Sequence, residues 1–164
     1  MRVRIAIFVL LFATPALAQE PVGCDKFKWP LDQERKLLAT AAPVASGAEV
    51  ARPLGAAVAI SLARLGDAKL PQPPSRTPKQ PDAYAGFVRV PPLPKPGTYR
   101  ITLSQGAWID VFQDGHGVKS ADFSGAAGCD GIRKSVKFEL TAAPFVVEIT
   151  GSPTETIAVV ITPD

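Results

Sequence analysis

The chain has 164 residues, of which 18 are Lys or Arg, 15 are Asp or Glu and one is His, for a formal net charge of +3. Arg2 and Arg4 lie in an apparent export signal, and without these two basic residues the net charge falls to +1. A nearly neutral chain lacks the electrostatic attraction that nucleic acids and anionic membrane surfaces require, so we expect no nucleic-acid partner.

Residues 1–18 predict a cleaved signal peptide. Two arginines precede the apolar stretch "IAIFVLLFATPALA", whose final "ALA" has the small-x-small pattern of a cleavage site, so the mature chain is expected to start near Gln19. The stretch is too short for a membrane span, and a periplasmic or secreted location follows. The alternative is a lipid anchor on Cys24, although "PVGC" lacks the leucine of such sites.

Residues 19–164 are long enough for one domain with a core of its own. We expect an N-terminal arm with a short helix over 19–40 and a single β-sandwich domain over 41–164. Cys24 and Cys129 predict one disulfide, the simplest state of two cysteines in an exported chain, between the arm and a late strand. The alternative is a pair of reactive or metal-binding thiols, but the sequence has no CxxC motif and no nearby cluster of ligands.

The segment "CDKFKWPLDQERKLLAT", residues 24–40, contains the predicted helix. Asp32 is placed to cap it, and three leucines form a short apolar stripe (Leu31, Leu37 and Leu38). Phe27 and Trp29 precede the helix, and we expect them to dock the arm on a larger body.

Residues 41–96 are rich in alanine and proline. "AAVAISLARL" (56–65) predicts a first strand with Val58, Ile60 and Leu62 alternating, and "AGFVRV" (85–90) predicts a short strand. The proline-rich stretches 71–81 and 91–96 cannot be central strands, because proline lacks the backbone donor of a sheet ladder. We expect extended surface linkers there, and the alternative is a ligand for proline-binding modules.

From Gly97 onward, apolar and polar residues alternate, as in strands with one buried face. The residues predicted to point inward are Tyr99, Ile101, Leu103, Val136, Phe138, Leu140, Phe145, Val147, Ile149, Ile157, Val159 and Ile161. In "TIAVVIT" the second face is also apolar, at Ala158 and Val160, which predicts a central strand covered on both sides. The spacing predicts an all-β fold, an antiparallel β-sandwich of jelly-roll-like type.

The only histidine lies in "AWIDVFQDGHGVKSADF". "AWIDVFQ" (107–113) predicts a strand and "VKSADF" (118–123) its return, joined through Asp114-Gly115, a strong hairpin signal. His116 is therefore expected at an exposed hairpin tip. The alternatives are a metal ligand or a proton shuttle, which need a second group to orient the imidazole, and Asp114 is the local candidate.

A single histidine limits catalysis and metal binding. Zinc and non-haem iron sites need more ligands, and no serine has a nucleophile-elbow context, so we expect no catalytic residue, no metal and no cofactor. A metal enzyme would need His116 from several subunits to meet on a symmetry axis. Glycine-containing loops with single acidic residues leave calcium binding as an alternative, but these loops lack the regularly alternating acids of a dedicated calcium-binding loop. Paired carboxylates leave acid–base hydrolysis open, with candidates at Asp110, Asp114, Asp122, Asp130, Glu139 and Glu148.

The candidate binding residues are Trp108, Asp110 and Phe112, on the strand face opposite the apolar one. An exposed aromatic beside a carboxylate is a platform for a sugar ring or a partner loop. The alternative is that Phe27 or Trp29 of the arm covers Trp108 and completes a second core layer. A small basic patch predicts a solvated strand edge or an anion site: Arg133, Lys134 and Lys137.

Residues 97–161, from "GTYRITLSQG" to "TETIAVVI", are similar to the small β-sandwich of secreted bacterial peptidases, the pre-peptidase C-terminal type, which implies an accessory or binding module. "CDKFKWPLDQER", "AWIDVFQDG" and "FSGAAGCDGIRKSVKF" resemble a group of small exported proteins of Gram-negative bacteria without an established function. Some members are labelled homogentisate 1,2-dioxygenase. Enzymes of that name are longer cupin proteins that hold iron with two histidines and a glutamate, and a chain with one histidine has no positions for that set.

Together these features predict an exported, non-catalytic binding or accessory protein of the periplasm or cell envelope, with an envelope protein or a glycan as partner. The alternative class is an enzyme, either a hydrolase with paired carboxylates or a metal-dependent enzyme whose ligands are shared between subunits. The residues leave the oligomeric state open.

Overall fold

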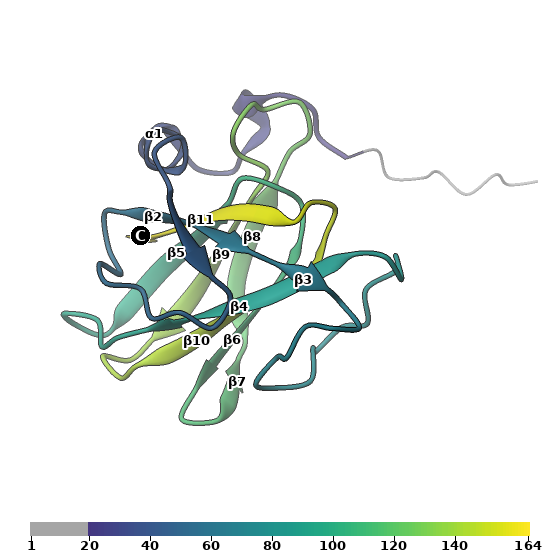
Figure 1. Ribbon diagram of the computed structural model, residues 1–164. Coiled ribbons are helices and arrows are strands. Elements are labelled where there is room, and N and C mark those ends of the chain that lie inside the picture. The colour runs from purple at the N-terminus through teal and green to yellow at the C-terminus, as the bar shows by residue number, and fades with distance from the viewer. Residues whose placement is uncertain (1–19) are drawn as a thin grey trace, which may run out of the picture.

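The computed structural model describes residues 20–164, in which two β-sheets pack face to face (Figure 1). The predicted signal peptide over 1–18 and the predicted start near Gln19 lie outside these residues. The expected fold class, an all-β sandwich with one short α-helix, is confirmed. Within residues 20–164, no helix has the length and apolar character needed to cross a membrane.

The larger sheet has six strands in the order β1-β2-β11-β5-β9-β8. The strands are Ala42–Ala45 (β1), Ala57–Ser61 (β2), Gly97–Leu103 (β5), Ser120–Gly125 (β8), Lys134–Leu140 (β9) and Thr156–Pro163 (β11). Neighbouring strands pair antiparallel except β1 and β2, which are parallel. The last strand of the chain therefore lies inside this sheet, between β2 and β5.

The smaller sheet has five strands in the order β3-β4-β10-β6-β7, all paired antiparallel. The strands are Ala63–Arg64 (β3), Tyr84–Val90 (β4), Trp108–Gln113 (β6), His116–Val118 (β7) and Phe145–Ser152 (β10). Both edge strands, β3 and β7, are short, which limits the unpaired backbone that the sheet presents to other chains.

The main core fills the space between the sheets. All twelve residues that the alternation placed inward from Gly97 onward are buried there, and none is more than 4% exposed. Ile60 and Leu62 join them, and Val58 packs at the margin of the core. Burial of these side chains is the main favourable contribution to folding, and the strict period of two is its signature in the sequence.

A second, smaller core covers the outer face of the six-stranded sheet. The arm supplies a 3-10 turn at Cys24–Lys26 (η1) and the helix α1 at Asp32–Leu38, which packs on β11 and β2. The predictions that the arm docks on a larger body and that the last strand is covered on both sides are confirmed. The members of this core are Leu31, Leu38, Ala57, Cys129, Ile132 and Val160, with Phe27, Trp29, Leu37, Ala41 and Ala158 partly buried against them.

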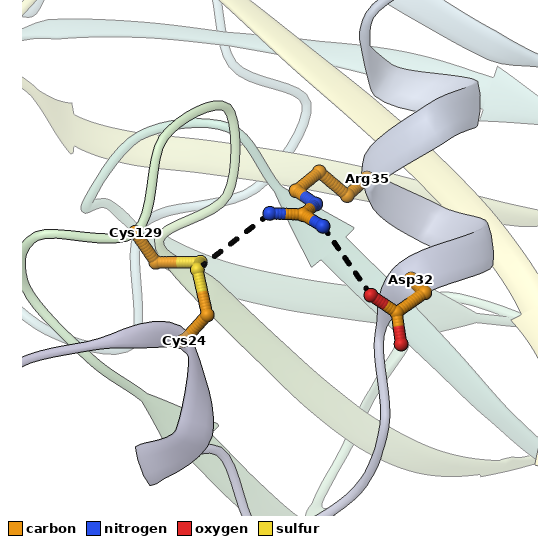
Figure 2. The surroundings of a disulfide bond; sticks show 4 residues. All are labelled: Cys24, Asp32, Arg35 and Cys129. Carbon is orange, nitrogen blue, oxygen red and sulfur yellow. Dashed lines mark hydrogen bonds and ion pairs between the residues drawn. A yellow bond between two sulfur atoms is a disulfide. The ribbon is translucent and has the colours of Figure 1, made fainter.

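The predicted disulfide joins Cys24 to Cys129, whose Cα atoms are 4.8 Å apart. Figure 2 shows it beside α1, where the Arg35 guanidinium donates to Cys24 Sγ (3.8 Å) and pairs with Asp32 (3.3 Å). Cys129 lies in the loop between β8 and β9, so the bridge does not end in a strand as expected. The predicted cap is also wrong: Leu31 is the N-cap residue, and Asp32 is the first helical residue and makes no capping bond.

Two segments predicted as single strands are divided between the sheets. The segment 56–65 breaks at Leu62 into β2 of the larger sheet and β3 of the smaller sheet. The segment 118–123 breaks at Lys119: β7 before the break pairs with β6 in the smaller sheet, and β8 after it pairs with β9 in the larger sheet. Strands that change sheets form the corners of sandwiches, and hydrophobic alternation does not reveal the change because it continues through the break. The sequence pattern also missed β1, whose residues are mostly exposed.

Candidate functional site

The proline-rich segment 71–81, called the strap below, lies across the outer face of the five-stranded sheet. Gln72 N–H donates to Glu148 Oε1 (2.9 Å), and Ser75 N–H donates to Asp110 Oδ2 (3.1 Å). The Ser75 hydroxyl also donates to Asp110 Oδ1. The strap has no strand structure, as the prolines predicted, but two carboxylates of the sheet bind its backbone.

Asp110 and Glu148 are direct cross-strand partners on β6 and β10. Asp110 is 9% exposed and Glu148 is fully buried beneath the strap, where Glu148 Oε2 has no hydrogen-bond partner. Burial raises the pKa of Glu148, the Gln72 N–H opposes that rise, and the charge of Asp110 adds to it. The structure thus brings together two of the six acids considered for hydrolysis and covers both of them.

A cavity of about 550 Å³ opens at the corner where β6 of the smaller sheet meets β8 and β9 of the larger one. We call it the corner cavity. Trp108 lines it from β6, and Phe123, which is 62% exposed, lines it from β8. The remaining lining residues are Glu20, Pro21, Arg76, Gly106, Ala107, Ile109, Ser120, Gly125, Arg133, Lys134 and Val136.

Three cationic side chains converge on this cavity. Lys134 Nζ lies 4.9 Å from the centroid of the Trp108 ring and donates to the carbonyl of Ala107 (2.9 Å), and the Arg76 guanidinium lies 5.1 Å from the same ring. Within residues 20–164, neither Lys134 nor Arg76 has a carboxylate within ion-pair distance, whereas Arg133 pairs with Glu20. The cavity is therefore an aromatic site with excess positive charge.

The environment of Lys134 is unfavourable for its charge. Burial lowers the pKa of Lys134, the positive charges of Arg76 and Arg133 lower it further, and Asp110 opposes them. Lys134, Val136 and Phe138 are alternate residues of β9 and therefore point to the same face of the sheet. Since Val136 and Phe138 lie in the core, the aliphatic part of Lys134 also points toward the space between the sheets. An anion in the cavity would relieve this repulsion.

The three predicted binding residues share the outer face of the smaller sheet, but they do not form one platform. Trp108 lines the corner cavity, and Asp110 holds the strap. Phe112 lines a different hollow of about 450 Å³, with Pro71 and Pro144 among its other residues. The strap therefore separates Phe112 from the corner cavity.

The suggestion that Phe27 or Trp29 covers Trp108 is wrong, because both pack on the outer face of the other sheet, and only Glu20 and Pro21 of the arm line the cavity with Trp108. On that outer face the Trp29 indole N–H donates to Ser135 Oγ (3.2 Å), and Lys137 Nζ lies 4.5 Å from the Trp29 ring centroid. The Ser75 hydroxyl accepts a hydrogen bond from the Trp108 indole (3.0 Å), so the strap makes the contact expected of the arm. The predicted basic patch also divides: Lys137 lies on the outer face with Trp29, and Lys134 lies in the corner cavity.

His116 is exposed at the start of β7, directly after a turn with positive φ at Asp114 (51°) and Gly115 (78°), which agrees with the predicted hairpin. Asp122 pairs with Lys28, and Glu139 accepts from Thr98. Among residues 20–164, no three His, Cys, Asp or Glu side chains gather in an arrangement that would hold a metal ion.

Sequence reasoning missed Arg76 and the position of Lys134 beside Trp108. Arg76 lies within a stretch classed as a linker. Lys134 carried one local signal, a cation at an inward position of an alternating strand. Comparison of the chain with protein families, curated proteins and solved structures found no match in any of the three. The fold and the site define a disulfide-linked β-sandwich with a basic, aromatic cavity at one corner.

Proposed function

We propose that this protein is an exported, non-catalytic binding protein of the periplasm or cell envelope, and that it holds its ligand or partner in the corner cavity. One observation carries this proposal: Lys134, a partly buried cation against the Trp108 ring, has no carboxylate partner in residues 20–164. A buried charge is unfavourable unless it is paired, and an anionic group of a ligand or partner would supply the missing pair.

Binding agrees better with the geometry than hydrolysis does. Of the paired carboxylates, Asp110 accepts hydrogen bonds from Ser75 and Trp108, and Glu148 accepts one from the strap backbone. A substrate would have to displace the strap before it could reach either carboxylate. Loss of a detected hydrolase activity in Asp110→Asn and Glu148→Gln, with the fold retained, would favour the hydrolase instead.

The test is affinity purification of the tagged protein from the periplasm and envelope of the source organism, followed by mass spectrometry of bound proteins and glycans. Wild-type protein is compared with Lys134→Met, which removes the charge and keeps the length of the stem. The matched control is Lys36→Met, which removes an exposed charge of α1. Binding that Lys134→Met reduces and Lys36→Met preserves supports the proposal; equal recovery with all three proteins contradicts it.

The same experiment separates two types of partner. A stoichiometric protein partner makes this an accessory subunit with the corner cavity at its interface. Recovery of a bound glycan or small molecule makes it a ligand-binding protein. Cell fractionation with the native N-terminus tests export directly, and accumulation of the full-length chain in the cytoplasm would refute that part.

A further inference from the structure

We infer that the corner cavity binds an acidic saccharide, a sugar ring bearing a carboxylate. The inference rests on the proposed binding function and adds the chemical class of the ligand. It is drawn from the size of the cavity, the division of its wall into an apolar and a cationic part, and the fixed orientation of Trp108.

The cavity has the size of a site for a small ligand. Its volume of about 550 Å³ lies within the usual range of about 300–1,000 Å³ for small-ligand sites. A second hollow of about 480 Å³ shares Arg76 and Trp108 with it and continues along the strap past Lys79. Two hollows joined at an indole give space for consecutive rings of an extended ligand.

The wall has both parts that a sugar acid requires. The Phe123 ring, which is 62% exposed, offers apolar surface to the cavity, and Ile109 and Val136 add aliphatic surface. The Trp108 ring joins this surface to the cationic part, because the Arg76 guanidinium and Lys134 Nζ lie over it. Such surface matches the C–H face of a pyranose ring, whose hydroxyl groups point outward from the ring edge. A neutral sugar would gain no charge pairing from the cations, and a small inorganic anion would leave the aromatic surface unused.

The cations offer hydrogen-bond donors that the protein leaves unused. An ammonium group has three donors, and Lys134 uses one of them, to the Ala107 carbonyl. The Arg76 guanidinium makes no side-chain hydrogen bond within residues 20–164, and it lies over the Trp108 ring. Carboxylate recognition by two such groups gives charge-assisted hydrogen bonds, the stronger kind.

Trp108 is oriented before any ligand arrives. Its indole N–H donates to both Ser75 Oγ and Asp110 Oδ1, each at 3.0 Å, which fixes the plane of the ring. The Asp110 carboxylate accepts hydrogen bonds from the Trp108 indole and from Ser75 of the strap. Fixing an aromatic platform in advance reduces the entropy lost on binding.

The experiment is calorimetric titration of the protein with trigalacturonate and with its fully methyl-esterified form, which keeps the rings and removes the charge. The variants are Lys134→Met and Arg76→Gln, and Lys36→Met is the control. Arg76 is exposed on the strap, so Arg76→Gln tests the site without disturbing the core. Each of the two variants is expected to weaken trigalacturonate binding about tenfold or more, while Lys36→Met leaves it unchanged.

A Trp29→Phe background leaves Trp108 as the only tryptophan, so a fluorescence change on titration reports the site itself. Absence of trigalacturonate binding overturns the inference, as does equal affinity for the methyl ester. Equally tight binding of inorganic sulfate or of a glutamate-rich peptide also overturns it. If these probes fail while capture from the envelope still depends on Lys134, the binding function stands and only the ligand class is wrong.

Discussion

The disulfide between Cys24 and Cys129 gives the sharpest prediction about stability. The bridge closes a loop of 105 residues, which includes most of the sandwich. In the chain-entropy model, a loop of this length stabilises the fold by about 4.8 kcal/mol at 25 °C, because the cross-link restricts the unfolded chain. A domain of this size has a total stability of about 5–15 kcal/mol, so the loss would be a large part of it.

The perturbation is the double variant Cys24→Ala/Cys129→Ala, since alanine avoids a buried hydroxyl at Cys129, which is 8% exposed. Urea unfolding, followed by circular dichroism, is expected to show a midpoint lower by about 2 M. This value assumes that the free energy of unfolding falls by about 1–3 kcal/mol per molar urea, which is the slope referred to below. The slope should rise, because the unfolded chain without the cross-link exposes more surface.

The matched control is Leu38→Ala, which removes apolar contacts from the same second core and keeps the bridge. It is expected to cost about 2–3 kcal/mol, with the slope unchanged. A double variant that loses less than about 1 kcal/mol, or that loses stability without a change in slope, would refute the entropic reasoning. The stabilisation would then come from contacts of the arm in the folded state.

Three further predictions concern the strap and the hairpin. The pKa of Glu148 is raised above its ordinary 4.5, so its contribution to stability is present below that pH and is lost as the pH rises through the folded-state pKa. Glu148→Gln should therefore be more stable than wild type at pH 8 but not at pH 4. The same difference in melting temperature between the variant and wild type at both pH values would contradict this prediction. Ser75→Ala should cost about 1–3 kcal/mol and speed hydrogen exchange of the strap, since it leaves Asp110 short of a donor; unchanged exchange would show that Ser75 does not hold the strap. His116→Ala should change stability by less than about 0.5 kcal/mol, and a larger loss would assign the exposed imidazole a structural role.

The amino-acid sequence was sufficient to predict the part of the main core that the strands from Gly97 onward supply. Tyr99, Ile101 and Phe138 lie inward because alternation in a strand is a local property, fixed by the pleat of the backbone. The hairpin at Asp114-Gly115 was predictable for the same reason, because the turn depends on the φ angles that these two residues adopt. The disulfide was predicted from the presence of two cysteines in a chain expected to be exported.

The candidate site could not be predicted in the same way. Lys134 and Trp108 are on different sheets, and the strap that brings Arg76 to the same place shows no periodic pattern. Asp110 and Glu148 face each other only because β6 and β10 pair in one register, and a shift of one residue would turn them to opposite faces.

The sequence by itself thus determined the inward faces of the strands from Gly97 onward, the turn at Asp114-Gly115 and the pair of cysteines that bond. Only the tertiary structure decided where the chain changes sheets, which face the arm and the strap each cover, and which cations surround Trp108. The physical reason is the range of the interactions involved. Alternation and turn geometry act over a few residues, whereas strand pairing and the meeting of side chains at a sandwich corner depend on the packing of the whole chain.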